Sequence, residues 1–285
     1  MRQGDPWLGA VAAPPVPRPV KPRNYGLTMV IDKGLGVRQT ADLLELAAEA
    51  IDYIKLAFGT SLLYPAPVLC QKIEMIREHG IHVYPGGTLY ELAHVEGRTR
   101  AFARSARALG FTVLEVSEGT ADLTPDDRLR MIDAAMEAGL KVVTEVGKKD
   151  SRVRLEAPQV IEQVAADLAQ GSHLVIIEGR DSGQGAGAYD DQGRPRLDLV
   201  DEVLRGVDRP EVLMWEAPQG KQQLYWIQRL GPGVNLGNVQ PHDVVALEAT
   251  RCALRGDTMR QALRGLTEVF GGGAKESGGM CRRPS

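Results

Sequence analysis

A short apolar run that ends in a charged residue and a glycine or proline turn recurs along this chain. The five clearest copies are Ile51–Gly59 (IDYIKLAFG), Val113–Gly119 (VLEVSEG), Lys141–Lys149 (KVVTEVGKK), Leu174–Arg180 (LVIIEGR) and Val212–Pro218 (VLMWEAP). Each copy is typical of a buried strand that carries its charge near the C-terminal end. Repeated units of this kind build a barrel of parallel strands, where one mouth collects the functional side chains.

Apolar runs alternate with segments of helical spacing. The predicted strands cover residues 27–32, 52–58, 81–84, 112–117, 141–146, 173–178, 211–217 and 234–237. The predicted helices cover residues 40–50, 67–79, 88–109, 158–169, 197–205, 219–230 and 241–254, and a further helix opens at residues 124–127. Eight strands close a barrel, and the first turn, Asp32–Gly36, lacks the GxGxxG pattern of a doubly wound sheet. We therefore predict an α/β fold with a single (β/α)8 TIM barrel over residues 25–268.

Both ends of the chain differ in composition from this body. Residues 1–24 contain six prolines and show little periodicity, which indicates a flexible Pro-rich leader. Residues 269–285 are rich in glycine and indicate a disordered tail.

Composition excludes several classes of protein. The net charge of −3 gives no basic field, so we expect no nucleic-acid partner. No apolar run reaches the ~18 residues of a membrane span, so we expect no membrane partner. The three cysteines have no CxxC or His-rich spacing, which argues against both a disulfide framework and a zinc site. With no apolar signal-peptide core at the N-terminus, we expect a cytoplasmic protein.

The charges at the predicted strand ends are the candidate site. They comprise the carboxylates Glu115, Glu145, Glu178 and Glu216 and the cations Lys33, Lys55, Lys148 and Arg180. Carboxylates without a histidine or cysteine cluster suit Mg²⁺, and clustered cations suit a multiply charged anion. Any one of these glutamates could instead be a structural salt-bridge or loop-capping residue. Lys149 and Lys221 are expected to be solvated surface lysines, because lysine rarely stays buried.

Two glycine-containing turns could offer backbone N–H groups to a phosphate. One is the loop Arg180–Gly187 and the other is the turn Asn235–Asn238, which precedes the last predicted helix. The same glycines could serve only to allow tight turns.

Eight motifs, taken together in their order along the chain, resemble those of the phosphosulfolactate synthase family. They are Lys55–Ser61 (KLAFGTS), Tyr84–Thr88 (YPGGT), Glu115–Gly119 (EVSEG), Thr144–Lys148 (TEVGK), Ile177–Gly183 (IEGRDSG), Trp215–Gln219 (WEAPQ), Asn235–Asn238 (NLGN) and Leu254–Thr258 (LRGDT). The resemblance extends over about residues 22–260 and leaves out the leader and the tail.

This resemblance implies a (β/α)8 barrel enzyme, a carbon–sulfur lyase of coenzyme M biosynthesis. The family adds sulfite to phosphoenolpyruvate with Mg²⁺ to give (2R)-phospho-3-sulfolactate. The resemblance also suggests a homo-oligomer. It implies Lys148 as the general acid that protonates an aci-carboxylate intermediate. The implied metal ligands are Glu145, Glu178, Glu216 and, next in order, Glu115. The implied substrate-binding residues are Lys55, Arg180, Ser182, Asn235 and Lys33.

Other functions fit the same residues. A related barrel enzyme could use another nucleophile or another enol phosphate. An aldolase- or enolase-like enzyme could use a Schiff-base lysine or proton abstraction, since Lys55 and Lys148 both lie at predicted strand ends. The family also has a plant heat-stress-associated branch, so a non-catalytic stress-associated barrel is a third alternative, although the charged rim favours an enzyme.

Overall fold

The computed structural model describes residues 7, 10–11, 13–149 and 152–271. The chain forms two compact units, one comprising Pro19–Glu248 and the other Met1–Arg18 with Ala249–Ser285. All strands of the described chain lie in the larger unit. They are β1 (Thr28–Asp32), β2 (Tyr53–Leu56), β3 (His82–Tyr84), β4 (Val113–Val116), β5 (Lys141–Val146), β6 (Leu174–Ile177), β7 (Leu213–Glu216) and β8 (Asn235–Val239).

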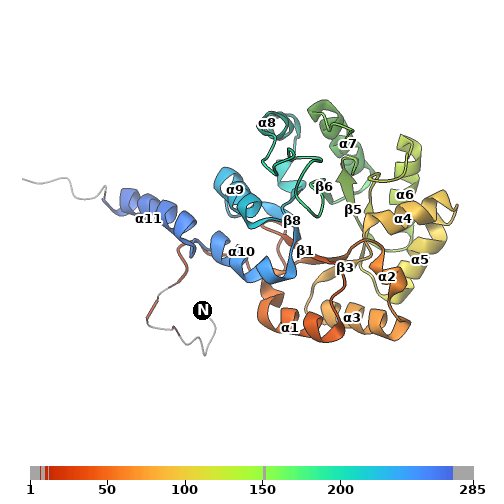
Figure 1. Ribbon diagram of the computed structural model, residues 1–285, viewed down its shortest axis with the longest axis horizontal. Coiled ribbons are helices and arrows are strands. Elements are labelled where there is room, and N and C mark those ends of the chain that lie inside the picture. Colours follow the sequence, from red (N-terminus) through yellow and green to blue (C-terminus); the bar gives the residue numbers. More distant parts are fainter. Residues whose placement is uncertain (1–6, 8–9, 12, 150–151, 272–285) are drawn as a thin grey trace, which may run out of the picture. The chain divides into compact units, whose positions relative to one another are not determined.

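The eight strands form one parallel sheet in the order β3-β2-β1-β8-β7-β6-β5-β4. The two end strands, β3 and β4, approach each other where the backbone N–H of Thr112 donates to the carbonyl of Val83 at 3.1 Å. The sheet is thus a nearly closed barrel with helices around it (Figure 1). This arrangement confirms the predicted (β/α)8 TIM barrel.

Helices connect successive strands around the outside of the barrel. They are α1 (Val37–Ala47), α2 (Thr60–Leu63), α3 (Ala66–Glu78), α4 (Gly87–Val95), α5 (Thr99–Leu109), α6 (Pro125–Glu137), α7 (Ala157–Gln170), α8 (Leu197–Gly206) and α9 (Gly220–Leu230). Two further helices follow β8, α10 (Val244–Arg251) and α11 (Gly256–Gly271). Single turns of 3-10 helix are η1 (Ala48–Ala50), η2 (Pro210–Val212) and η3 (Pro241–Asp243).

Three helical segments differ from the sequence-based expectation. The single helix expected over 88–109 is divided into α4 and α5, because Gly97 between them takes a φ of 71°. The short helix α2 was not predicted. Helix α11 begins at Gly256, where no element was expected, and runs to the end of the described chain. The remainder of the predicted tail, residues 272–285, lies outside the described residues.

The end of the proline-rich leader is bound to the barrel. Lys21 donates to the carbonyls of Ala48 and Ile51 at 3.0 and 2.5 Å, and Arg23 pairs with Asp52 at 3.0 Å. The barrel unit comprises Pro19–Glu248. No helix of the described residues is both long and apolar enough to cross a membrane.

Side chains alternate along each strand between the barrel interior and the layer under the helices. A small apolar cluster fills the interior and includes Tyr53, Val113, Val143, Ile176 and Met214. A much larger cluster packs the outer faces of the strands against the helices. One strand shows both faces, because Met214 points inward while its neighbour Trp215 stacks on Trp226 at a centroid distance of 4.2 Å. The interior layer is the floor on which the site is built.

Candidate active site

The alternation that buries the interior layer also creates the site. On five strands, the residue two positions after an interior apolar side chain lies on the same face and is charged. Lys55, Glu115, Glu145, Glu178 and Glu216 follow Tyr53, Val113, Val143, Ile176 and Met214 in this way. The charges therefore form a layer at the C-terminal mouth, the usual place for catalytic groups in such barrels.

Lys55 is the central cation of this layer. Its Nζ lies 2.9 Å from Glu115 Oε2, 3.0 Å from Glu145 Oε2 and 3.5 Å from Glu216 Oε1. Burial by itself would lower the pKa of Lys55, but the three carboxylates outweigh it and raise the pKa well above its ordinary value. Lys55 therefore stays protonated.

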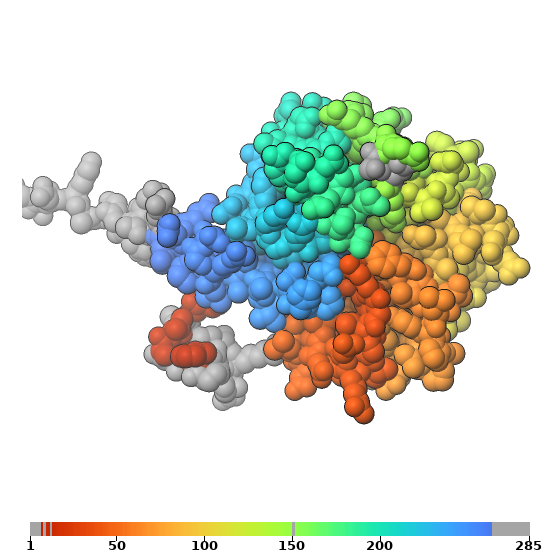
Figure 2. Space-filling model, viewed as in Figure 1, coloured from red at the N-terminus to blue at the C-terminus, as the bar shows by residue number. Residues whose placement is uncertain are grey.

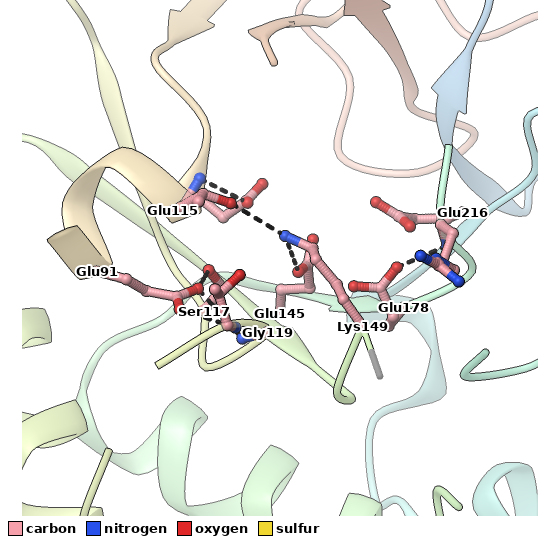
Figure 3. A network of polar contacts seen from close by, with 12 residues as sticks. Glu91, Glu115, Ser117, Gly119, Glu145, Lys149, Glu178 and Glu216 are labelled. Carbon is pink, nitrogen blue, oxygen red and sulfur yellow. Dashed lines mark hydrogen bonds and ion pairs between the residues drawn. The ribbon is translucent and has the colours of Figure 1, made fainter. Parts of the chain in front are cut away.

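Lys149 reaches the same layer from the loop after β5. Its Nζ lies 3.6 Å from Glu145 Oε1 and donates to Thr88 Oγ1 at 3.3 Å (Figure 3). The Glu145 carboxylate raises the pKa of Lys149, and this effect exceeds that of burial. The expectation that Lys149 is a solvated surface lysine is therefore wrong, because only a third of its side chain is exposed and its ammonium faces buried carboxylates.

The structure does not bring Lys148 to these carboxylates. Its Nζ donates to the Ala121 carbonyl at 3.1 Å and lies 3.6 Å from Asp122. Residues 145, 147 and 149 lie two positions apart, and this spacing was the signal for Lys149 in the sequence, although β5 itself ends at Val146.

Three of these carboxylates, Glu145, Glu178 and Glu216, have pKa values that are shifted in different directions. Burial would raise the pKa of Glu145, but Lys55 and Lys149 lower it to about 2. Burial raises the pKa of Glu216 to about 7, with Lys55 opposing and Glu145 adding to the rise. Burial and the neighbouring Glu145 and Glu216 raise the pKa of Glu178 well above its ordinary value. Without added positive charge, the cluster therefore holds protons near neutral pH.

These carboxylates fit a divalent cation. One oxygen from each of Glu145, Glu178 and Glu216 lies within 4.8 Å of the others. One oxygen of each carboxylate accepts a hydrogen bond. The donor is the Lys55 ammonium for Glu145, the Arg180 backbone N–H for Glu178 and the Gly179 backbone N–H for Glu216. The second oxygens of Glu145 and Glu178 are buried and have no hydrogen-bond partner among the described residues. Three hard oxygen donors of this kind suit Mg²⁺.

Glu115 is held differently from the other three. Its Oε1 accepts from the backbone N–H of Gly87 at 2.9 Å, and its Oε2 faces Lys55. It therefore lies outside the group of three that converges on one point.

A buried ion pair fixes the strand that carries Glu145. Arg128 on α6 pairs with Asp167 on α7 at 2.6 Å, and both side chains are about 1% exposed or less. The Arg128 guanidinium also donates to the backbone carbonyl of Glu145 at 3.0 Å. The pair thus ties two outer helices to the strand end that holds the central carboxylate.

A cavity of about 170 Å³ opens above the charged layer. Its lining includes Lys55, Lys149, Glu178, Glu216, Arg180, Asp181, Phe58 and Asn238. Phe58, Arg180 and Asn238 all have positive φ values, of 57°, 59° and 52°. Non-glycine residues held in this region are often found at functional sites, where strain is maintained by the surrounding structure.

The predicted anion-binding residues are placed unevenly. Arg180 lines the cavity, and Lys33 lies at its rim, where it pairs with Asp181 at 3.1 Å. This pair joins the segments that follow β1 and β6, which meet on the face shown in Figure 2, in orange-red and green. Ser182 is exposed, and its backbone carbonyl accepts from Gln219.

Asn235 is remote from the cavity, at the start of β8. Its amide donates to the carbonyls of Glu211 and Leu213, and its oxygen accepts from the Leu27 N–H. The residue that sequence reasoning missed is Asn238, at the other end of the motif. It lines the cavity, and its buried Oδ1 has no hydrogen-bond partner among the described residues.

Comparison with known proteins identifies the family. The model of the (2R)-phospho-3-sulfolactate synthase (ComA) family matches residues 16–257. The phosphosulfolactate synthase of Methanothermobacter thermautotrophicus is 42% identical over 245 residues, which cover 85% of this chain and 95% of the relative. The phosphosulfolactate synthase of Bacillus subtilis is 35% identical over 240 residues, 84% of this chain and 94% of the relative.

More distant similarities extend beyond these enzymes. Protein HEAT-STRESS-ASSOCIATED 32 of Arabidopsis thaliana is 25% identical over 260 residues, covering 82% of this chain and 88% of that protein. Among solved structures, an N-acetylneuraminate lyase from Mycoplasma synoviae superposes with a TM-score of 0.52 at 10% identity, covering 87% of this chain and 81% of the other, and supports the fold alone. On the family match and the identities above, this chain is an enzyme of the lyase type and belongs to the phosphosulfolactate synthase family.

Proposed function

We propose that this enzyme catalyses the Mg²⁺-dependent addition of sulfite to phosphoenolpyruvate, giving (2R)-phospho-3-sulfolactate. The observation that carries the proposal is the layer at the barrel mouth, where three converging carboxylates adjoin two lysines that are held protonated. Both substrates are anions, and their encounter requires concentrated positive charge.

Glu145, Glu178 and Glu216 would hold the magnesium ion, with Glu115 acting instead as a partner of Lys55. When bound, the ion supplies Lewis-acid stabilisation of negative charge on a substrate carboxylate. The protons that burial keeps on Glu178 and Glu216 would leave when it binds, because a metal ligand must be deprotonated.

The addition step needs a cationic acid. The sulfur lone pair of sulfite attacks the methylene carbon of phosphoenolpyruvate and forms the C–S bond. The electrons of the C=C bond move into the carboxylate and give an aci-carboxylate, and a lysine ammonium then gives its proton to the central carbon. The lysine regains a proton from solvent.

We assign this acid role to Lys149 in place of Lys148. Lys149 lines the cavity and faces Glu145, whereas Lys148 bonds to the Ala121 carbonyl. Lys55 is also protonated, but three carboxylates surround its ammonium, which favours a role in holding the cluster together.

The substrate anions would be bound on the other side of the cavity. Arg180 brings a guanidinium, a good partner for phosphate or carboxylate, and Asn238 brings a buried amide. Lys33 at the rim would exchange its partner Asp181 for the incoming anion. Ser182 can contribute only from the exposed loop beside Arg180.

The high lysine pKa values disfavour a Schiff-base mechanism, which requires a free amine. The intact charged layer disfavours a non-catalytic role. By analogy with the family, we also propose that the enzyme is a cytoplasmic homo-oligomer.

Phosphorus NMR of purified protein tests the reaction. Phosphoenolpyruvate, sulfite and Mg²⁺ should yield a new phosphoester resonance that disappears when sulfite is omitted or a chelator is added. A folded, metal-loaded protein that gives no such resonance would contradict sulfite as the nucleophile, and other nucleophiles and enol phosphates would then be screened.

A further inference from the structure

Glu91 on α4 is a buried carboxylate outside the cluster of Lys55 and its partners. Its side chain is 2% exposed, and no ion pair joins it to a cation within the described part of the chain. Four donors surround it instead (Figure 3). Its Oε1 accepts from Ser117 Oγ at 2.5 Å and Gly119 N at 3.1 Å, and its Oε2 accepts from the N–H groups of Thr120 and Ala121 at 2.9 and 2.6 Å.

The donors come from one continuous segment, residues 117–121, which follows β4. Three backbone N–H groups that point at one buried carboxylate fix the path of the segment, because the buried Glu91 oxygens and the buried Gly119 N–H would be costly to leave unpaired. A carboxylate suits this role since it offers acceptors only. Glu91 therefore determines the conformation of this loop.

The loop in turn contacts Lys149. The backbone N–H of Lys149 donates to the Gly119 carbonyl at 3.1 Å. The Lys149 side chain also lies close to this glycine, since a Cβ at Gly119 would lie 3.0 Å from Lys149 Cε. The far end of Lys149 is held by Thr88, one turn before Glu91 on the same helix. Helix α4 thus holds the lysine at both ends, through Glu91 and Gly119 at the backbone and through Thr88 at the ammonium.

We propose that Glu91 is a positioning residue of this enzyme, which holds the 117–121 loop so that Lys149 stays against Glu145. The inference rests on the proposed function only for the role of Lys149 as the acid. The geometric part, that Glu91 controls where the Lys149 ammonium lies, stands independently of the reaction. Glu91 touches neither the cavity nor the converging carboxylates.

The variant Glu91→Gln tests the inference with almost no change in volume. An amide keeps a single acceptor oxygen and presents two N–H donors, so it meets the Thr120 and Ala121 N–H groups with a donor. The loop should separate from α4, and the Lys149 side chain should move from Glu145. The matched control is Glu96→Gln, which changes an exposed glutamate at the end of the same helix.

The first readout is the rate at which an amine-reactive reagent labels Lys149, followed by mass spectrometry. In the wild-type enzyme the Lys149 ammonium lies against Glu145 and Thr88, and only a third of the side chain is exposed, so labelling is slow. Once the loop separates from α4 these contacts are lost and the side chain becomes accessible to the reagent, so Glu91→Gln should label Lys149 several-fold faster. The exposed Lys221 is the internal reference and should not change. A Lys149 rate equal to that of wild type in folded Glu91→Gln overturns the proposal.

The second readout is turnover. Glu91→Gln should lower kcat more than tenfold while KM for phosphoenolpyruvate changes less than threefold, and Glu91→Asp should restore part of the rate. Equal kcat in Glu91→Gln and wild type would also overturn the proposal. If wild-type protein gives no turnover, the proposed function fails, yet the labelling experiment still decides the role of Glu91. If Glu91→Gln does not fold, Ser117→Ala removes one of the four donors and is labelled in its place, with the same expected direction.

Discussion

Lys149 Nζ lies 3.6 Å from Glu145 Oε1, although Glu145 is on β5 and Lys149 is in the loop that follows it. The adjacent Lys148 is directed to the Ala121 carbonyl instead. Two consecutive lysines thus have different surroundings, and only one faces the buried carboxylates. This difference gives a matched pair of variants.

Lys149→Ala should lower kcat by about 10²- to 10⁴-fold, the usual contribution of a general acid. Lys148→Ala should stay within a few-fold of wild type. Steady-state turnover and circular dichroism of both variants check this expectation. Equal losses in the two variants, or a larger loss in Lys148→Ala, would return the acid role to Lys148.

Glu178→Gln should raise the Mg²⁺ concentration needed for half-maximal turnover by at least about tenfold, because it removes a charged oxygen with no hydrogen-bond partner among the described residues. Mg²⁺-dependent thermal stabilisation should weaken in parallel. The control Glu156→Gln changes an exposed carboxylate and should behave as wild type. An unaltered Mg²⁺ requirement in Glu178→Gln would exclude this residue as a ligand.

The stability that the protonated Glu216 carboxyl contributes to the metal-free protein should be lost as pH rises from about 4.5 to about 7. Burial raises the pKa of Glu216 from an ordinary 4.5 to about 7, so between these values the folded state binds a proton that the unfolded state has released. This contribution therefore falls as that proton is lost. The pKa of Glu145 is lowered and acts in the opposite direction below this window, and the burial that lowers the pKa of His82 to about 4 acts in the opposite direction within it.

Urea unfolding at pH 5, 6, 7 and 8 with a chelator measures this dependence. Mg²⁺ should restore most stability near pH 8, because the carboxylates are then free to bind it. In chelator, the stability of wild type relative to Glu216→Gln should fall between pH 5 and pH 8, because the other titrating groups are common to both proteins. A difference that does not change with pH would show that Glu216 holds no proton in the folded state at the lower pH values.

Asp167→Ala should destabilise the fold by about 3–5 kcal/mol, since it leaves the Arg128 guanidinium buried without its partner. Loss of the pair should also free the Glu145 carbonyl and reduce Mg²⁺ affinity. The control Arg100→Ala breaks an exposed pair and should leave stability almost unchanged. Chemical denaturation compares the two, and similar losses would contradict the structural role assigned to Asp167.

The barrel and the carboxylate layer were predictable from the sequence. Strand periodicity is local, so one apolar position determines which residues share its face. Val143 with Glu145 and Met214 with Glu216 are examples of this rule. Parallel strands then gather such residues at one mouth without any knowledge of the loops.

The tertiary structure alone decided what the loops contribute. The alternation that points to Lys149 weakens beyond the strand end, and its choice over Lys148 depends on the Gly119 carbonyl and Thr88, which are distant in the sequence. Glu91 carried no signal, because its donors are mainly backbone N–H groups, which every residue except proline possesses. The sequence by itself determined the barrel and the face on which its charges lie, because these follow from local alternation. Which charges meet depended on contacts between distant segments, and only the folded chain specifies those.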